Sequence, residues 1–232
     1  MRIDRIEFRN FKGFKEQAFD FPRSLSAPAE AGSFHVLIGE NGTGKTSILD
    51  APAVALGVWL IKTPDSSLAN SRRPISPADK RLEAAPGGDR SLFQEAPGDV
   101  SVRAFGRIED RDDLIWEERI SQGKTRADNA GAKEAIETVQ HAFARAQAAE
   151  HVLLPIIAYY GGAGRAWWAH NERSKARAAS HGYARRLGAL YDCLNERIRL
   201  SDLASWFQGE AIVRGNRGGT NRPGFEVVKL AV

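Results

Sequence analysis

The residues best suited to chemistry lie together in one glycine-rich stretch, Gly39-Glu40-Asn41-Gly42-Thr43-Gly44-Lys45-Thr46. This stretch matches the phosphate-binding pattern G-x-x-x-x-G-K-[ST] at every fixed position. Its glycines permit backbone angles that turn successive N–H groups toward one concave site, where those amides and the following helix N-terminus attract phosphate. We expect the Lys45 ammonium to reach the β and γ phosphates of ATP, and the Thr46 hydroxyl to bind Mg²⁺.

The predicted nucleotide contacts extend through this motif and one residue beyond it. Backbone amides and the Lys45 ammonium provide most of the positive charge, and Thr46 is the predicted metal ligand. A glycine-rich turn without a ligand is the alternative, and the complete pattern argues against it. The predicted contacts are Gly39, Asn41, Gly42, Thr43, Gly44, Lys45, Thr46 and Ser47.

A strand and a helix must position this loop. His35–Ile38 is a short apolar run that ends at a glycine, which is typical of a buried central strand. A helix is expected to begin at Lys45. Pro52 lies within it, and an interior proline costs about 3 kcal/mol, so we expect the helix to kink there or to stop after about two turns. Its expected inward positions are Ile48, Leu49 and Leu56.

Alternating apolar and charged residues predict two strands before the motif. Arg2–Phe8 has the period-two pattern of a half-buried strand, and a second extended stretch ends near Phe19 and Phe21. Residues 24–32 are polar and contain proline, so we expect a surface loop there. Lys62–Gly98 is rich in Pro, Ser, Asp and Gly, and we expect it to form a long exposed loop insert.

The middle of the chain predicts a β-hairpin followed by a helix. Val100–Ile108 and Leu114–Ile120 are expected to pair across a turn over residues 109–113, with Trp116 packed in the core. From Ala132, apolar residues recur at spacings of three and four, as on one face of a helix. These apolar residues are Ile136, Val139, Phe143 and Ala146.

The last third begins with Val152–Tyr160, an apolar run that predicts another buried strand. Pro155 is expected near its start, because proline is disfavoured inside a central strand. A stripe at helical spacing then predicts a helix, in which Cys193 is expected to be a small buried hydrophobe. A short second helix is expected around Trp206. The stripe comprises Leu187, Leu190, Tyr191, Leu194 and Ile198.

Two segments resemble the opening of RecF/SMC-type, ABC-like ATPases. They are residues 3–14, IDRIEFRNFKGF, and residues 38–51, IGENGTGKTSILDA. In that family the first strands cover the nucleotide, and the turn equivalent to residues 10–13 lies near the base and phosphates. The resemblance therefore implies that Asn10 and Lys12 contact the nucleotide. The alternative is that both are surface turn residues.

A third segment narrows the resemblance. Leu154–Arg165 is similar to the AYYG-x-GR segment of bacterial, RecF/OLD-like AAA-family ATPases found in phage-defence operons, some of which work beside a nuclease. Tyr191–Leu194 and Trp206-Phe207 point the same way. In ABC-like ATPases a Q-loop glutamine follows this strand, and here Tyr160 and Gly161 take its place.

Three further features are not assigned to the site by the resemblance. Gln94 and Gln122 lie elsewhere in the sequence than the expected position of the Q-loop. Arg165 either approaches a phosphate across an interface or is a solvated loop residue. The Trp167-Trp168 pair either stacks on bases or anchors a loop by packing.

These elements and the resemblance predict an α/β fold: a P-loop NTPase whose ABC-ATPase-like N-terminal lobe has a mixed β-sheet and a β-hairpin. We expect residues 1–160 to form that lobe, with 62–98 as the loop insert. Residues 161–232 are expected to begin the helical subdomain of an incomplete C-terminal lobe. A sheet that lacks its remaining strands exposes an edge that invites pairing.

The parts needed for turnover are missing from this sequence. After the P-loop there is no apolar run ending in Asp-Glu, no Ser-Gly-Gly signature and no assignable switch histidine. Hydrolysis needs groups that orient water and stabilise the transition state, so no catalytic residue is assigned. We expect a C-terminal lobe or a partner to supply them.

Composition limits the remaining classes of protein. A net charge of +4 is compatible with a nucleic-acid partner without arguing for one. One cysteine, Cys193, excludes an intramolecular disulfide. Ala51–Ile61, the longest apolar run, is too short to span a bilayer, and the charged N-terminus excludes a secretory signal, so we expect a cytoplasmic protein without a membrane partner.

The leading hypothesis is ATP binding and hydrolysis, coupled to nucleic-acid processing or anti-phage defence by nucleotide-driven dimerisation. The expected partners are a second copy or a partner ATPase lobe, with a nuclease and DNA as further candidates. The alternative is a nucleotide-gated binding module without its own catalysis. A small-molecule kinase fits the motif but not the strands that precede it.

Overall fold

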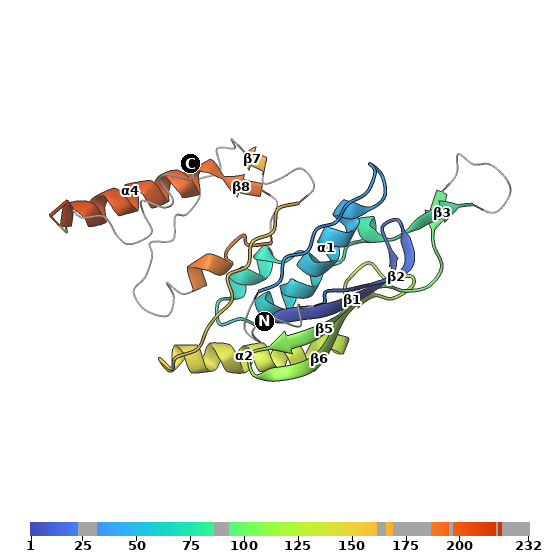
Figure 1. The fold of residues 1–232 in the computed structure, drawn as a ribbon, viewed down its shortest axis with the longest axis horizontal. Coiled ribbons are helices and arrows are strands. Elements are labelled where there is room, and N and C mark those ends of the chain that lie inside the picture. Colours follow the sequence, from blue (N-terminus) through green and yellow to red (C-terminus); the bar gives the residue numbers. More distant parts are fainter. Residues whose placement is uncertain are drawn as a thin grey trace.

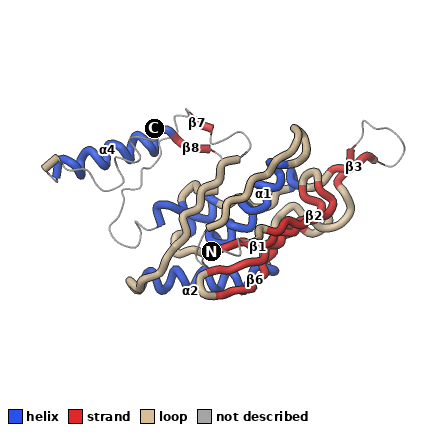
Figure 2. The backbone as a smooth tube through the Cα atoms, viewed as in Figure 1, coloured by secondary structure: helices blue, strands red, loops and turns tan. Residues whose placement is uncertain are grey.

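The computed structural model describes residues 1–22, 32–85, 93–161, 166–168, 187–194, 197–216 and 218–219. Figure 1 shows the elements in chain order, and Figure 2 separates helices from strands. The strands are β1 Arg2–Phe11, β2 Phe14–Asp20, β3 Leu82–Ala84, β4 Phe93–Glu95, β5 Val100–Ile108, β6 Arg111–Ile120, β7 Ala166–Trp168 and β8 Arg197–Arg199. The α-helices are α1 Lys45–Leu56, α2 Lys133–Gln147 and α4 Leu200–Asn216, and the 3₁₀ helices are η1 Gly57–Leu60, η2 Ser66–Ser71, η3 Pro77–Asp79, η4 Ala130–Ala132 and η5 Leu187–Leu190.

The central feature is a four-stranded antiparallel sheet in the order β2-β1-β5-β6. Its period-two pattern places Ile6, Ala104 and Trp116 in one register row, and all three are buried. The predicted N-terminal strands and hairpin are therefore confirmed. The hairpin turn is shorter than expected, because Ile108 already pairs with Arg111.

Helices α1 and α2 pack on the inward face of this sheet (Figure 1). Trp116 donates its indole N–H to the Ala55 carbonyl at 3.0 Å, which joins the end of α1 to β6. The rings of Trp59 and Phe143 meet edge to face at 5.9 Å, which joins η1 to α2. The predicted helix after Ala132 is confirmed as α2, with the expected apolar face buried.

Helix α1 runs through Pro52 and ends only at Leu56, so it does not stop after two turns. Small residues on its buried side, including Ala51, let the backbone approach the sheet closely. Leu49 is 46% exposed, which corrects the expectation that it points inward.

Two segments predicted as buried strands are not strands. Residues 32–40 and 151–161 are extended coil, and no strand of the described part of the chain pairs with either. Ile38 and Ile156 are 93% and 88% exposed. An apolar run forms a buried strand only where a neighbouring strand provides hydrogen bonds, and the described sheets provide none here.

The segment after η1 is less exposed than expected for a loop insert. Leu68 and Ile75 are buried, and β3 pairs with β4 as a short hairpin. Residues 86–92 of this segment lie outside the described residues. This proline-rich and polar segment therefore forms short irregular elements, and its apolar residues Leu68 and Ile75 are buried in the core.

The predicted helix over 187–198 is wrong in type. The chain forms the 3₁₀ turn η5, then turns, and reaches the strand β8, which pairs in parallel with β7. Leu187, Leu190 and Leu194 are nevertheless buried, and Cys193 is buried as expected. These apolar positions are buried because a turn can bury the same positions as a helix.

The expected helix around Trp206 is confirmed as α4 and is longer than predicted. Within the described ranges, no helix is long and apolar enough to cross a membrane. Arg165, most of the loop over 24–32 and the end of the chain lie outside the described residues. Trp167-Trp168 lies in β7, where only the backbone is described.

Replacing Phe143 tests this packing. Phe143 is 1% exposed, so Phe143→Ala should lower the free energy of unfolding by about 3 to 5 kcal/mol through lost burial and a residual cavity. Phe93→Ala is the matched control, because Phe93 is 65% exposed on β4 and should change stability by less than about 0.5 kcal/mol. Urea unfolding followed by circular dichroism measures both, and equal losses would contradict the assigned core.

Candidate nucleotide-binding site

The predicted phosphate-binding loop precedes α1 directly. Gly42 and Gly44 have φ angles of 84° and 89°, in the left-handed region that glycine tolerates best. Gly44 is the N-cap of α1 and provides no side-chain cap, and the first turn contains no acidic residue. The amide groups at this helix end therefore have no capping partner from their own turn, as an anion site requires.

Lys45 lies across the mouth of the loop. Its ammonium donates to the carbonyl oxygens of Gly39 at 2.8 Å and Glu40 at 2.5 Å. The Thr43 hydroxyl donates to the same Glu40 carbonyl at 2.8 Å. The lysine of the motif is thus placed within its own loop, at the position from which it can turn to a phosphate.

The loop rests on the first residue of β2. A Cβ atom added at Gly44 would lie 2.6 Å from Cζ of Phe14, so the bare glycine backbone is pressed against this ring. The Phe14 ring in turn packs edge to face on Phe8 at 5.2 Å. The turn between β1 and β2 therefore supports the phosphate-binding loop from the side of the sheet.

Asn10 and Lys12, the contacts implied by the resemblance, are both held by protein groups. The Asn10 amide donates to the carbonyls of Pro97 at 2.9 Å and Asp99 at 3.2 Å, and the residue is buried. Asn10 is therefore not the exposed turn residue of the alternative interpretation. The Lys12 ammonium forms an ion pair with Asp50, and its backbone N–H donates to the Asp79 carbonyl at 2.6 Å.

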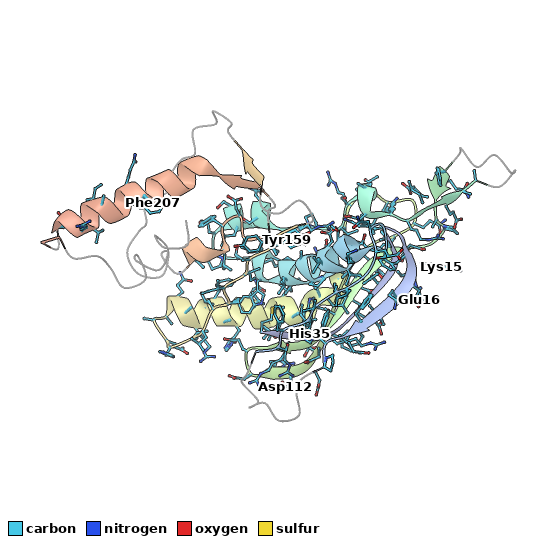
Figure 3. All side chains as sticks on the ribbon, turned by 45° about the horizontal axis from the view of Figure 1, so that its top comes forward. Lys15, Glu16, His35, Asp112, Tyr159 and Phe207 are labelled. Atoms are coloured by element: carbon cyan, nitrogen blue, oxygen red, sulfur yellow. The ribbon has the colours of Figure 1, made fainter. Side chains whose placement is uncertain are left out.

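Asp50 is the centre of a buried charge cluster that the sequence did not predict. It lies on the second turn of α1 and is 2% exposed. One carboxylate oxygen binds Lys12 and Arg73, the latter at 3.2 Å, and the other accepts the hydroxyl of Tyr159. Figure 3 shows Tyr159 beside α1. This single carboxylate thus joins four segments of the chain.

Asp79 balances the charge of this cluster. Arg73 contacts it at 2.8 Å, and Lys12 lies 3.9 Å from it, so two cations face two carboxylates. Burial disfavours the charged form of Arg73, but the hydrogen bond to Asp79 and the nearby carboxylates outweigh burial and raise the pKa of its guanidinium group. Buried charges are tolerated when they are paired in this way.

The sequence carried weak signals for Asp50 and Tyr159. Asp50 follows Thr46 by four residues, which places both on one face of α1. Tyr159 is buried whereas Tyr160 is exposed, as alternation along an extended segment requires. Gln94 lies on β4 and Gln122 follows β6, and both are exposed.

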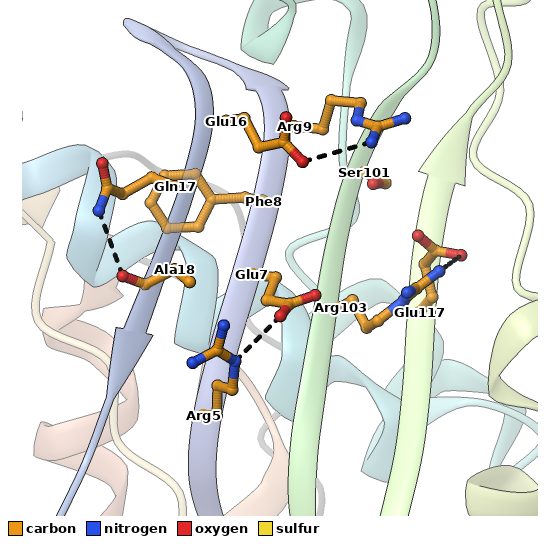
Figure 4. A pocket seen from close by; sticks show the side chains of 10 residues that line it. All are labelled: Arg5, Glu7, Phe8, Arg9, Glu16, Gln17, Ala18, Ser101, Arg103 and Glu117. Carbon is orange, nitrogen blue, oxygen red and sulfur yellow. Dashed lines mark hydrogen bonds and ion pairs between the residues drawn. The ribbon is translucent and has the colours of Figure 1, made fainter.

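A hollow lies on the outward face of the sheet, away from the phosphate-binding loop (Figure 4), and has a volume of about 370 Å³. None of the residues that line it belongs to the phosphate-binding loop. Its arginines face carboxylates, so little unpaired positive charge remains for a phosphate. The ion pairs are Arg5–Glu7 at 2.9 Å, Arg9–Glu16 at 3.3 Å and Arg103–Glu117 at 3.4 Å.

Comparison with known proteins identifies the family of this chain. The family model described as "AAA domain" matches residues 5–204, and the chain belongs to this family. The resemblance to an N-terminal lobe of RecF/SMC-like ATPases is confirmed.

Two curated relatives match shorter regions. The chromosome partition protein Smc of Methanocaldococcus jannaschii is 36% identical over 55 residues, which are 24% of this chain and 4% of that protein. The Septu protein PtuA of Bacillus mycoides is 44% identical over 54 residues, 23% of this chain and 7% of that protein. The match therefore covers only a small part of each relative's length.

The contact between Gly44 and Phe14 can be tested by two glycine substitutions. Gly42→Ala should lower the free energy of unfolding by about 1 to 2 kcal/mol, the cost of a left-handed backbone, because nothing lies near its Cβ. Gly44→Ala should lose a further 1 to 3 kcal/mol or so, since its Cβ meets the Phe14 ring.

Chemical denaturation of both variants gives these values. A Phe14→Leu background should shrink the additional loss at Gly44 and leave the loss at Gly42 unchanged, as expected for a coupled pair. Equal losses at the two glycines in every background would show that Phe14 does not support the loop.

Proposed function

We propose that this chain binds ATP with Mg²⁺ at residues 39–47. The observation that carries the proposal is the uncapped start of α1, preceded by left-handed Gly42 and Gly44, with Lys45 at the loop mouth. An anion at this position would receive main-chain N–H groups and the positive end of the helix. No side chain caps the helix end, so these amide groups are available to a phosphate.

Binding requires Lys45 to exchange its partners. Its ammonium leaves the carbonyls of Gly39 and Glu40 and turns to the β and γ phosphates, which carry full negative charge. Thr46 is exposed one residue later on the same helix turn, so its hydroxyl is free to serve as a ligand of Mg²⁺. Asn10 and Lys12 are proposed to lie near the nucleotide, because they belong to the β1–β2 turn that supports the loop.

A second lobe completes the site for turnover in this proposal. The segments 32–40 and 151–161 expose Phe34, Ile38, Leu153 and Ile156, and exposed apolar patches of this kind mark interaction surfaces. A partner ATPase lobe or a second copy that adds strands here would bury these side chains and bring the groups that orient water. Residues 1–160 are then the N-terminal lobe, and 161–232 lead into the second.

The family and the names of the two relatives support a proposed biological role. An ATP-driven lobe of this family fits nucleic-acid processing or anti-phage defence, with a nuclease as a candidate partner, and the Smc relative is named a chromosome partition protein. The second candidate is a nucleotide-gated binding module, because the sequence contains no Asp-Glu strand end or signature segment. Phosphate release by the chain with and without added partner lobe separates these functions.

Removal of Lys45 is the direct test of binding. For the wild-type chain, ATP and Mg²⁺ at 100 times the dissociation constant should stabilise the fold by about 2.7 kcal/mol, measured by thermal unfolding. Lys45→Ala should lose this stabilisation. Lys133→Ala is the control, since the Lys133 side chain is 81% exposed on α2 and should retain it. A wild-type chain that ATP·Mg²⁺ does not stabilise would contradict the proposal.

The proposed docking surface predicts self-association of the isolated chain. Sedimentation velocity should show concentration-dependent oligomers for the wild type, because extended apolar segments pair when uncovered. Ile38→Ser with Ile156→Ser should leave a monomer. Leu82→Ser with Phe93→Ser, on the exposed β3–β4 hairpin, should associate like the wild type. Oligomers that persist in the Ile38→Ser, Ile156→Ser variant would contradict a docking surface on these two segments.

A further inference from the structure

We propose that the hydrogen bond from Tyr159 to Asp50 transmits nucleotide occupancy from the P-loop helix to the segment 151–161. Tyr159 is a positioning residue in this proposal, since it acts through Asp50 and touches no phosphate. The inference rests on the proposed binding of ATP at residues 39–47.

The two oxygens of Asp50 divide the contacts by direction. Oδ2 binds Lys12 from the β1–β2 turn and Arg73 from the segment after η2, so it faces the N-terminal sheet region. Oδ1 accepts the Tyr159 hydroxyl, which comes from a segment 109 residues further along the chain. The tyrosine is buried, so water does not compete readily for this bond. Asp50 therefore holds the segment 151–161 to α1 through Oδ1, while its Oδ2 is paired with Lys12 and Arg73.

Helix α1 connects this bond to the phosphates. Thr46 and Asp50 are four residues apart and share one helix face. The start of α1 has no side-chain cap, so its amide groups gain hydrogen-bond partners when an anion binds. Phosphates that engage these amides, Lys45 and Thr46 would fix the first turn and thereby reduce motion of the next turn, which carries Asp50. A more fixed acceptor strengthens the bond to Tyr159.

Tyr159 extends the path to a further segment. Its backbone N–H donates to the Cys193 carbonyl at 2.9 Å, and the N–H of Asp192 donates to the Ser71 hydroxyl at 2.8 Å. The turn over 191–194 is thus fastened to Tyr159 on one side and to η2 on the other. Occupancy of the P-loop is expected to reach residues 187–194 through the backbone contact between Tyr159 and Cys193.

Tyr159→Phe is the substitution that isolates the coupling. It removes one hydroxyl and keeps the buried ring, whereas loss of the Asp50 carboxylate would leave Lys12 and Arg73 with Asp79 as their remaining carboxylate and endanger folding. Tyr191→Phe is the matched control. The Tyr191 hydroxyl donates to the carboxylate of Asp65, so the same chemistry is lost while the bond from Tyr159 to Asp50 is kept.

Hydrogen exchange followed by mass spectrometry reads both ends of the path in one experiment on the full chain. In the wild type, ATP with Mg²⁺ should slow exchange in peptides over 39–47 and also over 156–161, the latter by about tenfold, within the range of typical coupling factors. Tyr159→Phe should keep the first effect and reduce the second to less than about twofold. Tyr191→Phe should keep both.

The outcomes separate the two proposals. Full protection of 156–161 in Tyr159→Phe, or protection of 39–47 in the wild type without any at 156–161, overturns the coupling and leaves ATP binding intact. Equal loss at 156–161 in both tyrosine variants shows a general loosening and also overturns it. No protection at 39–47 in the wild type removes ATP binding and the coupling together.

Discussion

Helix α1 must meet two demands on consecutive turns. Its first turn leaves amide groups without a side-chain cap, and its second turn buries the carboxylate of Asp50 at 2% exposure. An uncapped helix end costs stability, and a buried charge costs more unless it is paired. Lys12, Arg73 and Tyr159 provide that pairing, and they come from three other parts of the chain. These contacts join the β1–β2 turn, the segment after η2 and the segment 151–161 to α1.

The supporting contacts explain why the loop keeps its shape without a ligand. Phe14 presses on Gly44, and the indole of Trp116 binds the Ala55 carbonyl at the other end of α1. The helix is therefore fixed at both ends to the antiparallel sheet. Lys45 meanwhile satisfies its charge on the Gly39 and Glu40 carbonyls, contacts that a phosphate would replace with stronger ones.

Local chemistry made part of this structure predictable. The phosphate-binding loop follows from glycine spacing, and β1, the β5–β6 hairpin and α2 follow from periodicity, because one buried face sets each pattern. Burial of Cys193 follows instead from its residue type, since a free cysteine behaves as a small hydrophobe. The strand predicted at residues 35–38 does not form, because a strand needs a hydrogen-bonded neighbour as well as its own apolar residues.

Long-range contacts could not be predicted from one sequence. Asp50 contacts Lys12 from 38 residues away and Tyr159 from 109 residues away, and no local pattern encodes either pairing. The helix expected over 187–198 failed for a related reason. Leu187, Leu190 and Leu194 are buried as predicted, but tertiary contacts, including the bond from Tyr159 to Cys193, accompany a turn there instead.

Amide chemical shifts of the loop test the central claim most directly. In a ¹⁵N-labelled chain titrated with ATP and Mg²⁺, the resonances of Gly42, Gly44 and Lys45 should move together and saturate, because their N–H groups turn to the phosphates. The Lys45→Ala chain should show no such saturation. Shifts confined to residues of the outward sheet face, or no shifts in a folded sample, would contradict a phosphate site at the start of α1.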